Sequence, residues 1–249
     1  MSEAAFLAAY DASAFDRPSV AVDIALMTVD GGSLRALLTR RAEHPARGQW
    51  SLPGGFVDPS ESLDDAARRV IQAKAGLTDI FVEQLYTFGA VDRDPRTRVI
   101  SVAYYALVDV ARLTPAIVAG ATGAADRRLA PVTVDWPGEA GGPAAVREEA
   151  GDDAGAPLPL AFDHAEMLGL VVQRLRGKLD YAPIGFEMLP DTFTLRQLQA
   201  VHETILGRSL NVDSFRRRML ASGELNATGT READTAHRPA ELYRFNPDD

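Results

Sequence analysis

The chain is 249 residues long, which allows one large domain or two smaller ones, with enough apolar residues for a buried core. It has no cysteine, so disulfide bonds, thiolate metal sites and thiol nucleophiles are excluded, and the composition fits a reducing cytoplasm. The net charge of −9 argues against unspecific binding of nucleic acid by the whole surface, and no apolar run approaches the roughly 20 residues that span a bilayer. We therefore expect a cytoplasmic protein with no membrane partner, in which any basic surface is local.

Short apolar segments in the first half of the chain predict β-strands. Residues 19–29 and 34–40 read as two strands joined around Gly31-Gly32, which is a hairpin signal. Residues 50–55 form a short strand that runs into a loop, and further strands are predicted at residues 79–88, 99–110 and 131–136. The segment 99–110 is almost continuously apolar or aromatic, so we expect it near the centre of the sheet.

A glycine-rich loop and the predicted helix 62–75 after it carry a recognisable spacing. Gly55, Glu61 and Arg69 match the Nudix box, G-x5-E-x7-R-E-U-x-E-E-x-G-U, where U is apolar. The next apolar, glycine and apolar positions are filled by Ile71, Gly76 and Leu77. The three remaining glutamate positions hold Val70, Ala73 and Lys74. The scaffold of the box is present, and its acidic residues are absent.

The three replaced glutamates exclude the usual chemistry of the box. In the Nudix family these carboxylates hold Mg²⁺ against a pyrophosphate, and this ion needs carboxylate or water oxygens. Two apolar side chains and an ammonium group cannot supply them, so we predict no metal, no cofactor and no hydrolysis by the usual route. The Glu61–Arg69 pair is, by the same resemblance, a structural brace. Lys74 is either a solvated helix residue or a direct counter-charge for a pyrophosphate.

Other basic and aromatic residues of the first half are candidates for binding a nucleotide. The predicted ligand-binding residues are Arg40, Arg41, Trp50, Lys74, Arg93, Arg96, Arg98 and Tyr104. The run DRDPRTR offers guanidinium groups to phosphate oxygens, or it is only a charged hairpin turn. Strand alternation points one of Arg40 and Arg41 inward, and Trp50 and Tyr104 either stack on a base or belong to the core. His164 is explained equally well by the start of a helix.

The middle of the chain contains the predicted boundary between two domains. Residues 137–157 are rich in Ala, Gly, Pro, Glu and Asp, and we expect a flexible acidic loop there because it buries little apolar surface. Residues 165–176 form an amphipathic helix that closes the first domain. We place the first domain at residues 1–179, a linker at 180–192 and the second domain at 193–249, since prolines bracket the segment 180–190.

The second domain reads as two helices and a hairpin. Thr194 and Gln197 have the capping-box spacing at the start of a helix 194–206, and Asn211 caps a second helix 212–221. On this second helix, Val212, Phe215 and Met219 share the buried side and Arg217 points away from it. Residues 224–230 and 241–245 are expected to form the two strands of a wing. This order is typical of a winged helix-turn-helix that reads DNA.

The predicted DNA-binding residues are the exposed polar and basic side chains of these elements. They are Thr194, Arg196, Arg208, Asn211, Asp213, Ser214, Arg216, Arg217, Arg218, Arg231, His237 and Arg238. The bulk charge of this segment is small, so the prediction depends on where the arginines point. The alternative for Arg216-Arg217-Arg218 is a solvated helix face.

Taken together, the two halves resemble the NrtR family, the Nudix-related transcriptional regulators of NAD metabolism. The segments that carry the resemblance, in order, are LPGGFVDPSESLDDAARRV, YTFGAVDRDPRTRVISVAYYALV, LAFDHAEM, RGKLDYAPIGFEMLP, FTLRQLQAVHETILGRSL and FRRRMLASG. The resemblance implies an α+β protein, with a Nudix-like α/β/α sandwich around a mixed sheet and a C-terminal winged helix-turn-helix. It also implies a homodimeric repressor of genes for NAD synthesis or salvage, bound to a palindromic operator and released by ADP-ribose or a related nucleotide.

Two other functions are consistent with parts of the sequence. One is a Nudix hydrolase of ADP-ribose or a nucleotide sugar, against which the residues at positions 70, 73 and 74 argue directly. The other is a regulator of the same architecture that senses a sugar. The loss of all three glutamates and the acidic loop are departures from the family's pattern, so the identity of the effector has to be tested.

Overall fold

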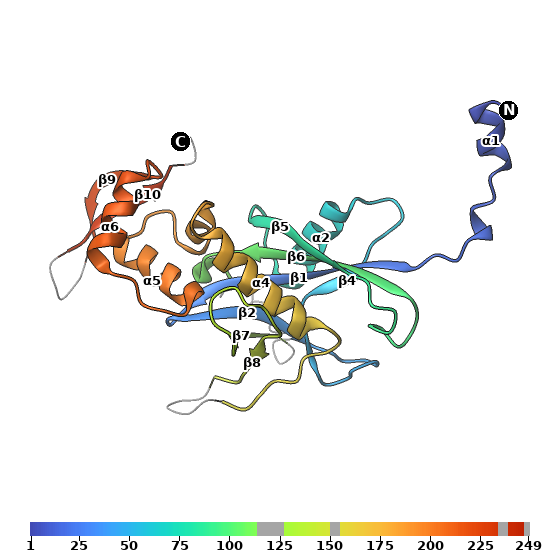
Figure 1. Ribbon diagram of the computed structural model, residues 1–249, viewed down its shortest axis with the longest axis horizontal. Coiled ribbons are helices and arrows are strands. Elements are labelled where there is room, and N and C mark those ends of the chain that lie inside the picture. The colour runs from blue at the N-terminus through green and yellow to red at the C-terminus, as the bar shows by residue number, and fades with distance from the viewer. Residues whose placement is uncertain (114–126, 150–154, 234–238, 247–249) are drawn as a thin grey trace.

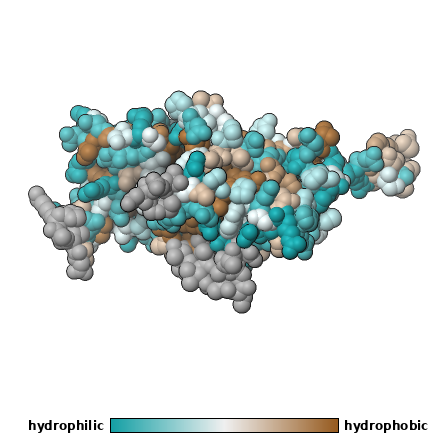
Figure 2. All heavy atoms as spheres, turned by 90° about the horizontal axis from the view of Figure 1, so that it is seen from below, coloured by the Kyte–Doolittle hydropathy of each residue, from teal (hydrophilic) through white to brown (hydrophobic). Residues whose placement is uncertain are grey.

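The computed structural model describes residues 1–113, 127–149, 155–233 and 239–246. An N-terminal mixed sheet has helices on both faces, and a smaller helical unit with a two-stranded sheet follows it (Figure 1). The short helix α1 (Glu3–Ala9) projects away from both on an extended arm (Figures 1 and 2). No helix in these described ranges is long and apolar enough to cross a membrane.

The large sheet has the strand order β5-β6-β1-β2-β7-β8. Its strands are β1 (Ser19–Asp30), β2 (Ser33–Arg40), β5 (Phe81–Phe88), β6 (Val99–Leu107), β7 (Arg127–Thr133) and β8 (Ala145–Val146). Two short strands extend it, β3 (Trp50–Ser51) on β2 and β4 (Gly54–Phe56) on β1. The pair β1–β6 is parallel and the other pairs are antiparallel, so the sheet is mixed as predicted.

Most strand predictions are confirmed, and one predicted strand lies a few residues earlier in the chain than expected. Gly31 and Gly32 have φ angles of 56° and 72°, which the tight turn between β1 and β2 requires. The strand predicted at residues 131–136 begins earlier, at Arg127, because residues 127–131 pair with β2.

The faces of the sheet are covered by α2 (Leu63–Ala75) and α4 (His164–Lys178), as Figure 1 shows. Successive side chains of β1 point to opposite faces. Val22, Ile24 and Leu26 therefore pack in the cluster with α2, while Ala25 and Met27 pack in the cluster with α4. This is the predicted α/β/α arrangement.

The acidic segment differs from the irregular loop that we expected. Ala145 and Val146 form β8 against β7, and the side chains of Ala144 and Val146 are buried in the core. The few apolar residues of this segment are sufficient to attach it to the sheet edge. Residues 150–154 lie outside the described residues.

The C-terminal unit contains α5 (Leu195–Leu206), α6 (Val212–Ala221) and the hairpin of β9 (Leu225–Arg231) and β10 (Glu241–Phe245). Phe215 and Met219 of α6 are buried as predicted, but Val212 is 62% exposed. Val212 is the first residue of α6 and lies outside the small core. Leu210, just before the helix, packs against this core instead. The linker carries a 3-10 helix, η3 (Pro183–Met188), in which Phe186 is buried, while Tyr181 before it is exposed.

Helix α5 belongs to both cores. Leu195 and Leu198, near its start, pack in the small C-terminal cluster. Val201 and Ile205, one and two turns later, pack in the large cluster of the sheet and α4. The two units are therefore joined by a shared helix as well as by the linker.

Candidate functional site

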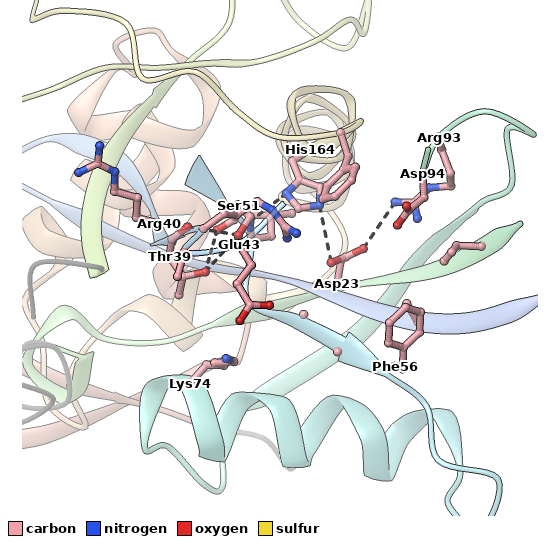
Figure 3. A pocket seen from close by; sticks show the side chains of 18 of the residues that line it. Asp23, Thr39, Arg40, Glu43, Ser51, Phe56, Lys74, Arg93, Asp94 and His164 are labelled. Carbon is pink, nitrogen blue, oxygen red and sulfur yellow. Dashed lines mark hydrogen bonds and ion pairs between the residues drawn. The ribbon is translucent and has the colours of Figure 1, made fainter. Parts of the chain in front are cut away.

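A cavity of about 530 Å³ opens beside the loop of the Nudix box, in the size range of small-molecule sites (Figure 3). Its walls come from the end of β2, the loop between β3 and β4, the segment 93–96 and the start of α4. Lys74 of α2 reaches it from below in the view of Figure 3. The cavity joins segments that are far apart in the sequence.

The brace predicted for the Nudix box is present. Arg69 Nε donates to Glu61 Oε2 at 2.9 Å, and its Nη2 donates to the Phe56 carbonyl at 2.9 Å. Glu61 also accepts from the backbone N–H of Asp58 at 2.8 Å. The hydrogen bonds from Arg69, and then from the Asp58 N–H, lower the pKa of Glu61 to about 2. Together they fix the loop between β4 and α2, two elements that both contribute residues to the lining of the cavity.

The metal-binding half of the box is absent from the structure as well as from the sequence. The Val70 side chain is buried and lies under Gly55, where an added Cβ would meet its Cγ2 at 3.3 Å. Ala73 is exposed, and Lys74 lines the cavity. No group of three or more His, Asp or Glu residues among the described residues is arranged to hold a metal ion. The residues at this position do not fit the Mg²⁺ that the Nudix fold implies.

A buried ionic network forms the back of the cavity, beneath the start of α4. Arg93 makes two hydrogen bonds to Asp163, of 2.7 and 2.8 Å, and lies 3.6 Å from Asp23. Asp23 also accepts from Ser101 Oγ at 2.5 Å. Sequence reasoning missed Asp23, although a single carboxylate in the apolar strand SVAVDIALMTV is a signal that could have found it.

His164 connects two other segments of the cavity lining, at Leu52 and at Asp23. Its Nδ1 accepts a hydrogen bond from the Leu52 N–H at 3.0 Å, and its Nε2 lies 3.7 Å from Asp23. Burial lowers the pKa of His164, and the nearby carboxylates of Asp23 and Asp163 oppose this effect. A neutral imidazole that accepts at Nδ1 carries its proton on Nε2, toward Asp23. The side chain therefore anchors the segment after β3 and does more than begin a helix.

Five of the eight predicted ligand-binding residues line the cavity, and three do not. Those that line it are Arg40, Arg41, Lys74, Arg93 and Arg96. Tyr104 is only 3% exposed, packs against α2 and donates to Asp64 at 2.8 Å, so its prediction as a stacking residue is wrong. Trp50 is buried in the other core under the guanidinium of Arg128, 5.2 Å from the ring. Arg98 donates to the Ala90 carbonyl at 2.9 Å and fixes its own loop.

Two aromatic residues that the sequence did not single out take the place of these candidates. Phe56 and Phe162 both line the cavity, and each has an arginine over its ring. The Arg41 guanidinium carbon lies 4.8 Å from the centre of Phe162, and that of Arg96 lies 5.6 Å from the centre of Phe56. An aromatic ring at a cavity wall offers a face on which a planar base can stack.

The second candidate site is the outer face of α6. Phe215 and Met219 are buried, and Arg217, halfway between them in the sequence, is exposed on the opposite side. Arg218 is exposed too, but it pairs with Asp180 of the linker at 3.1 Å. Arg216 interacts with Tyr243 of β10. Arg217 is thus the member of the triplet that is directed most clearly toward solvent.

The remaining predicted DNA-binding residues fall into three groups. Thr194 is buried in its capping box with Gln197, and the side chain of Asn211 accepts from the Ser214 N–H, so both are caps of helices. The exposed ones are Arg196, Arg208, Asp213, Ser214 and Arg231. His237 and Arg238 lie outside the described residues.

Both parts of the chain match known families. The NUDIX domain matches residues 17–126, and the family described as the NrtR DNA-binding winged helix domain matches residues 185–245. The "ADPR responsive transcriptional repressor NtrR" of Acinetobacter baylyi is 35% identical over 246 residues, which cover 98% of this chain and 88% of that protein.

Solved structures of a relative have the same arrangement. The crystal structure of Shewanella oneidensis NrtR matches with a TM-score of 0.72 and 31% identity, over 92% of this chain and 95% of that one. The same protein complexed with a 27mer DNA matches with a TM-score of 0.69 and 30% identity, over 92% and 94% of the two chains. Since the likeness extends over both domains and almost the whole length, this chain belongs to the NrtR family.

Proposed function

We propose that this chain is a transcriptional repressor that leaves its DNA when ADP-ribose binds in the cavity of the Nudix domain. The observation that carries the proposal is the 35% identity with an ADPR-responsive repressor over 98% of the chain. The regulated genes are those of NAD synthesis or salvage, and the protein binds their DNA in the cytoplasm. Residues 1–179 form the effector-binding domain, 180–192 the linker and 193–249 the DNA-binding domain.

The cavity supplies the chemistry that ADP-ribose requires. Its guanidinium and ammonium groups offer charge-assisted hydrogen bonds to a diphosphate, and Phe56 or Phe162 offers a face to the adenine ring. The neighbouring carboxylates Asp23 and Glu43 can accept from ribose hydroxyl groups. A nucleotide with two phosphates and two ribose units uses all three kinds of group.

The Nudix domain binds its effector without hydrolysing it. Hydrolysis in this fold depends on carboxylates that hold Mg²⁺, and positions 70, 73 and 74 carry none. An effector that survives in the cavity can act as a signal for as long as its concentration stays high. This property supports a sensor and argues against a hydrolase of ADP-ribose or of a nucleotide sugar.

DNA binding is assigned to α6, with Arg217 as its base-reading candidate. A winged helix inserts its second helix into the major groove, and a homodimer reads two half-sites of a palindrome. We expect the exposed Arg196, Arg208 and Arg231 to contact phosphates, since phosphate contacts position a protein without specifying sequence. We therefore expect two copies of the chain on each operator.

Helix α4 provides a physical connection between the two sites. It begins at the cavity, where Asp163 and His164 meet Arg93 and Asp23. Near its other end, Arg176 Nε donates to the Ile205 carbonyl of α5 at 2.9 Å. A small displacement of α4 by the effector is carried to α5 and hence to α6, and a coupling of about 1–3 kcal/mol is enough for a switch.

The test is a titration of the protein on DNA upstream of its own gene and of NAD-synthesis genes, at fixed salt with unspecific competitor DNA. We expect tight binding that ADP-ribose abolishes. Release by a pentose and not by ADP-ribose would favour a sugar-responsive regulator. Turnover of ADP-ribose in Mg²⁺, without specific binding to any operator, would favour the hydrolase.

A further inference from the structure

The lining of the effector cavity carries an excess of positive charge in a chain whose net charge is −9. Six cationic side chains line it, namely Arg40, Arg41, Lys74, Arg93, Arg96 and Arg127. Three acidic side chains line it, namely Asp23, Glu43 and Asp94. The difference of three positive charges is concentrated where a Nudix enzyme gathers negative charge around its metal.

Only two of these cations are neutralised within the described part of the chain. Arg93 is paired with Asp163 and Asp23, and Arg96 is paired with Asp94 at 2.7 Å. Among the described residues, the side chains of Arg40 and Arg41 donate hydrogen bonds only to backbone carbonyls, those of Gly48 and Pro45. The ion pairs found among the described residues include neither Lys74 nor Arg127. Four cationic groups are thus available to an anion.

The four available cations come from α2 on the one hand and from the paired ends of β2 and β7 on the other. Lys74 comes from α2, at the last glutamate position of the Nudix box. Arg40 and Arg41 end β2, and Arg127 begins β7, where it pairs with Thr39 in the sheet. Both Lys74 and Arg40 line the cavity, and Figure 3 shows Lys74 above α2 at the lower left and Arg40 at the upper left of the view. Burial and the charge of Arg96 lower the pKa of Arg41, so a bound anion would relieve an unfavourable environment.

We propose that this cavity holds the diphosphate of its effector without a divalent metal ion, with Lys74 and the available arginines in place of the ion. The inference rests on the proposed function, and it adds how the diphosphate is recognised. A guanidinium or ammonium group near a phosphate forms a charge-assisted hydrogen bond, whereas a Mg²⁺ ion placed beside Lys74 would be repelled. Any ligand with a diphosphate group shares this part of the binding mode.

The first experiment is calorimetry of the full chain with ADP-ribose, once in EDTA and once in Mg²⁺ at the same ionic strength. We expect the two Kd values to agree within roughly threefold, because positions 70, 73 and 74 carry no carboxylate and the described residues contain no group of three His, Asp or Glu side chains that could hold the ion. Binding that tightens by more than this in Mg²⁺ would overturn the inference and leave the proposed effector intact. Absence of binding in both buffers would instead refute ADP-ribose as the effector, so the two failures are distinguishable.

The second experiment uses variants of α2. Lys74→Gln should weaken the binding of ADP-ribose in EDTA by roughly tenfold, because one charge-assisted contact to the diphosphate is lost. The affinity for adenosine, which has no phosphate, should not change. The matched control is Arg68→Gln, which removes an exposed cation from the same helix outside the cavity and should leave both affinities unchanged. An unchanged ADP-ribose affinity in Lys74→Gln would overturn the role of Lys74.

Discussion

The effector cavity and the DNA-binding face both collect cationic side chains, but they do so in different ways. In the cavity, Arg40, Lys74 and Arg127 come from three elements that are far apart in the sequence. On α6, three consecutive arginines occupy one helix of ten residues. The cavity depends on the packing of the whole sheet, whereas the DNA-binding face depends on the rotation of one helix about its axis.

The two regions also differ in the core that supports them. The cavity stands on the two large clusters of the Nudix domain, and α6 stands on the small cluster that contains Phe186, Phe193 and Phe215. Their connection runs through α5, whose two halves lie in different clusters. A substitution deep in one cluster should therefore damage one function first and spare the other.

The largest effect is expected from Phe215→Ala, which empties the centre of the small cluster. Phe215 is 3% exposed and packs edge-on against His202, with ring centroids 5.1 Å apart. Removing a buried phenyl group costs about 3–5 kcal/mol, so we expect the C-terminal unit to unfold at lower urea and specific DNA binding to be lost. Calorimetry should find the ADP-ribose affinity unchanged.

Val212→Ala is the matched control for that variant, since it shortens an exposed apolar residue of the same helix. It should change the free energy of unfolding by less than about 0.5 kcal/mol. If Phe215→Ala weakened ADP-ribose binding as much as DNA binding, the two clusters would be a single cooperative unit and the comparison would fail.

His202 is expected to make the free energy of unfolding depend on pH, by up to about 3 kcal/mol. Burial, and then the charge of Arg218, lower the pKa of His202 to about 4, while Asp180 opposes the shift. The unfolded state, with an ordinary pKa of about 6.5, binds more protons between these values. The contribution of the neutral His202 to the free energy of unfolding is therefore fully present above about pH 6.5, and it is lost as the pH falls toward 4.

The measurement is urea unfolding of the parent and of His202→Leu at pH 7 and pH 5. The parent should lose more stability on acidification than the variant, because the variant keeps the buried His164 but lacks the His202 imidazole, which must be buried neutral. Equal losses in both proteins would show that His202 is not the group responsible.

The next effect is specific to the DNA-binding face. Arg217→Ala should weaken binding to the specific operator by about 1–3 kcal/mol if Arg217 reads a base edge, while ADP-ribose binding is unchanged. Arg218→Ala is an informative companion, because Arg218 is paired with Asp180 and should matter less. A titration in which the Arg217 variant matches the parent would mean that another part of α6 faces the DNA.

The sequence was most informative where structure is local. Helical periodicity placed Phe215, Met219 and Arg217 correctly, and the predicted capping residues Thr194 and Asn211 both act at the starts of their helices. The box spacing led to the Glu61–Arg69 brace because both residues belong to one loop and the helix after it. These features depend on neighbours within about a dozen positions.

Sequence reasoning failed where a site depends on the pairing of distant strands. Asp23 and Phe162 reach the cavity only because β1 pairs with β6 and α4 begins beside β3. Whether an aromatic residue of a buried strand faces the cavity or a helix depends on register, and a shift of one residue reverses the answer. Tyr104 was assigned to the wrong surface for this reason, while Phe56 was overlooked.

The smallest predicted effect tests that correction. Tyr104→Phe removes the hydrogen bond to Asp64 and keeps the ring, so it should cost about 1 kcal/mol of stability or less. Burial and the Asp64 carboxylate raise the pKa of Tyr104 to about 12, which fits a phenol that stays protonated in the core. Since Tyr104 packs against α2 and is absent from the cavity wall, the Kd for ADP-ribose should not change. Tyr86→Phe, at an exposed position of β5, is the control and should alter neither quantity. A clear loss of ADP-ribose affinity in Tyr104→Phe alone would return this residue to the effector site and place the effector on the α2 face of the sheet.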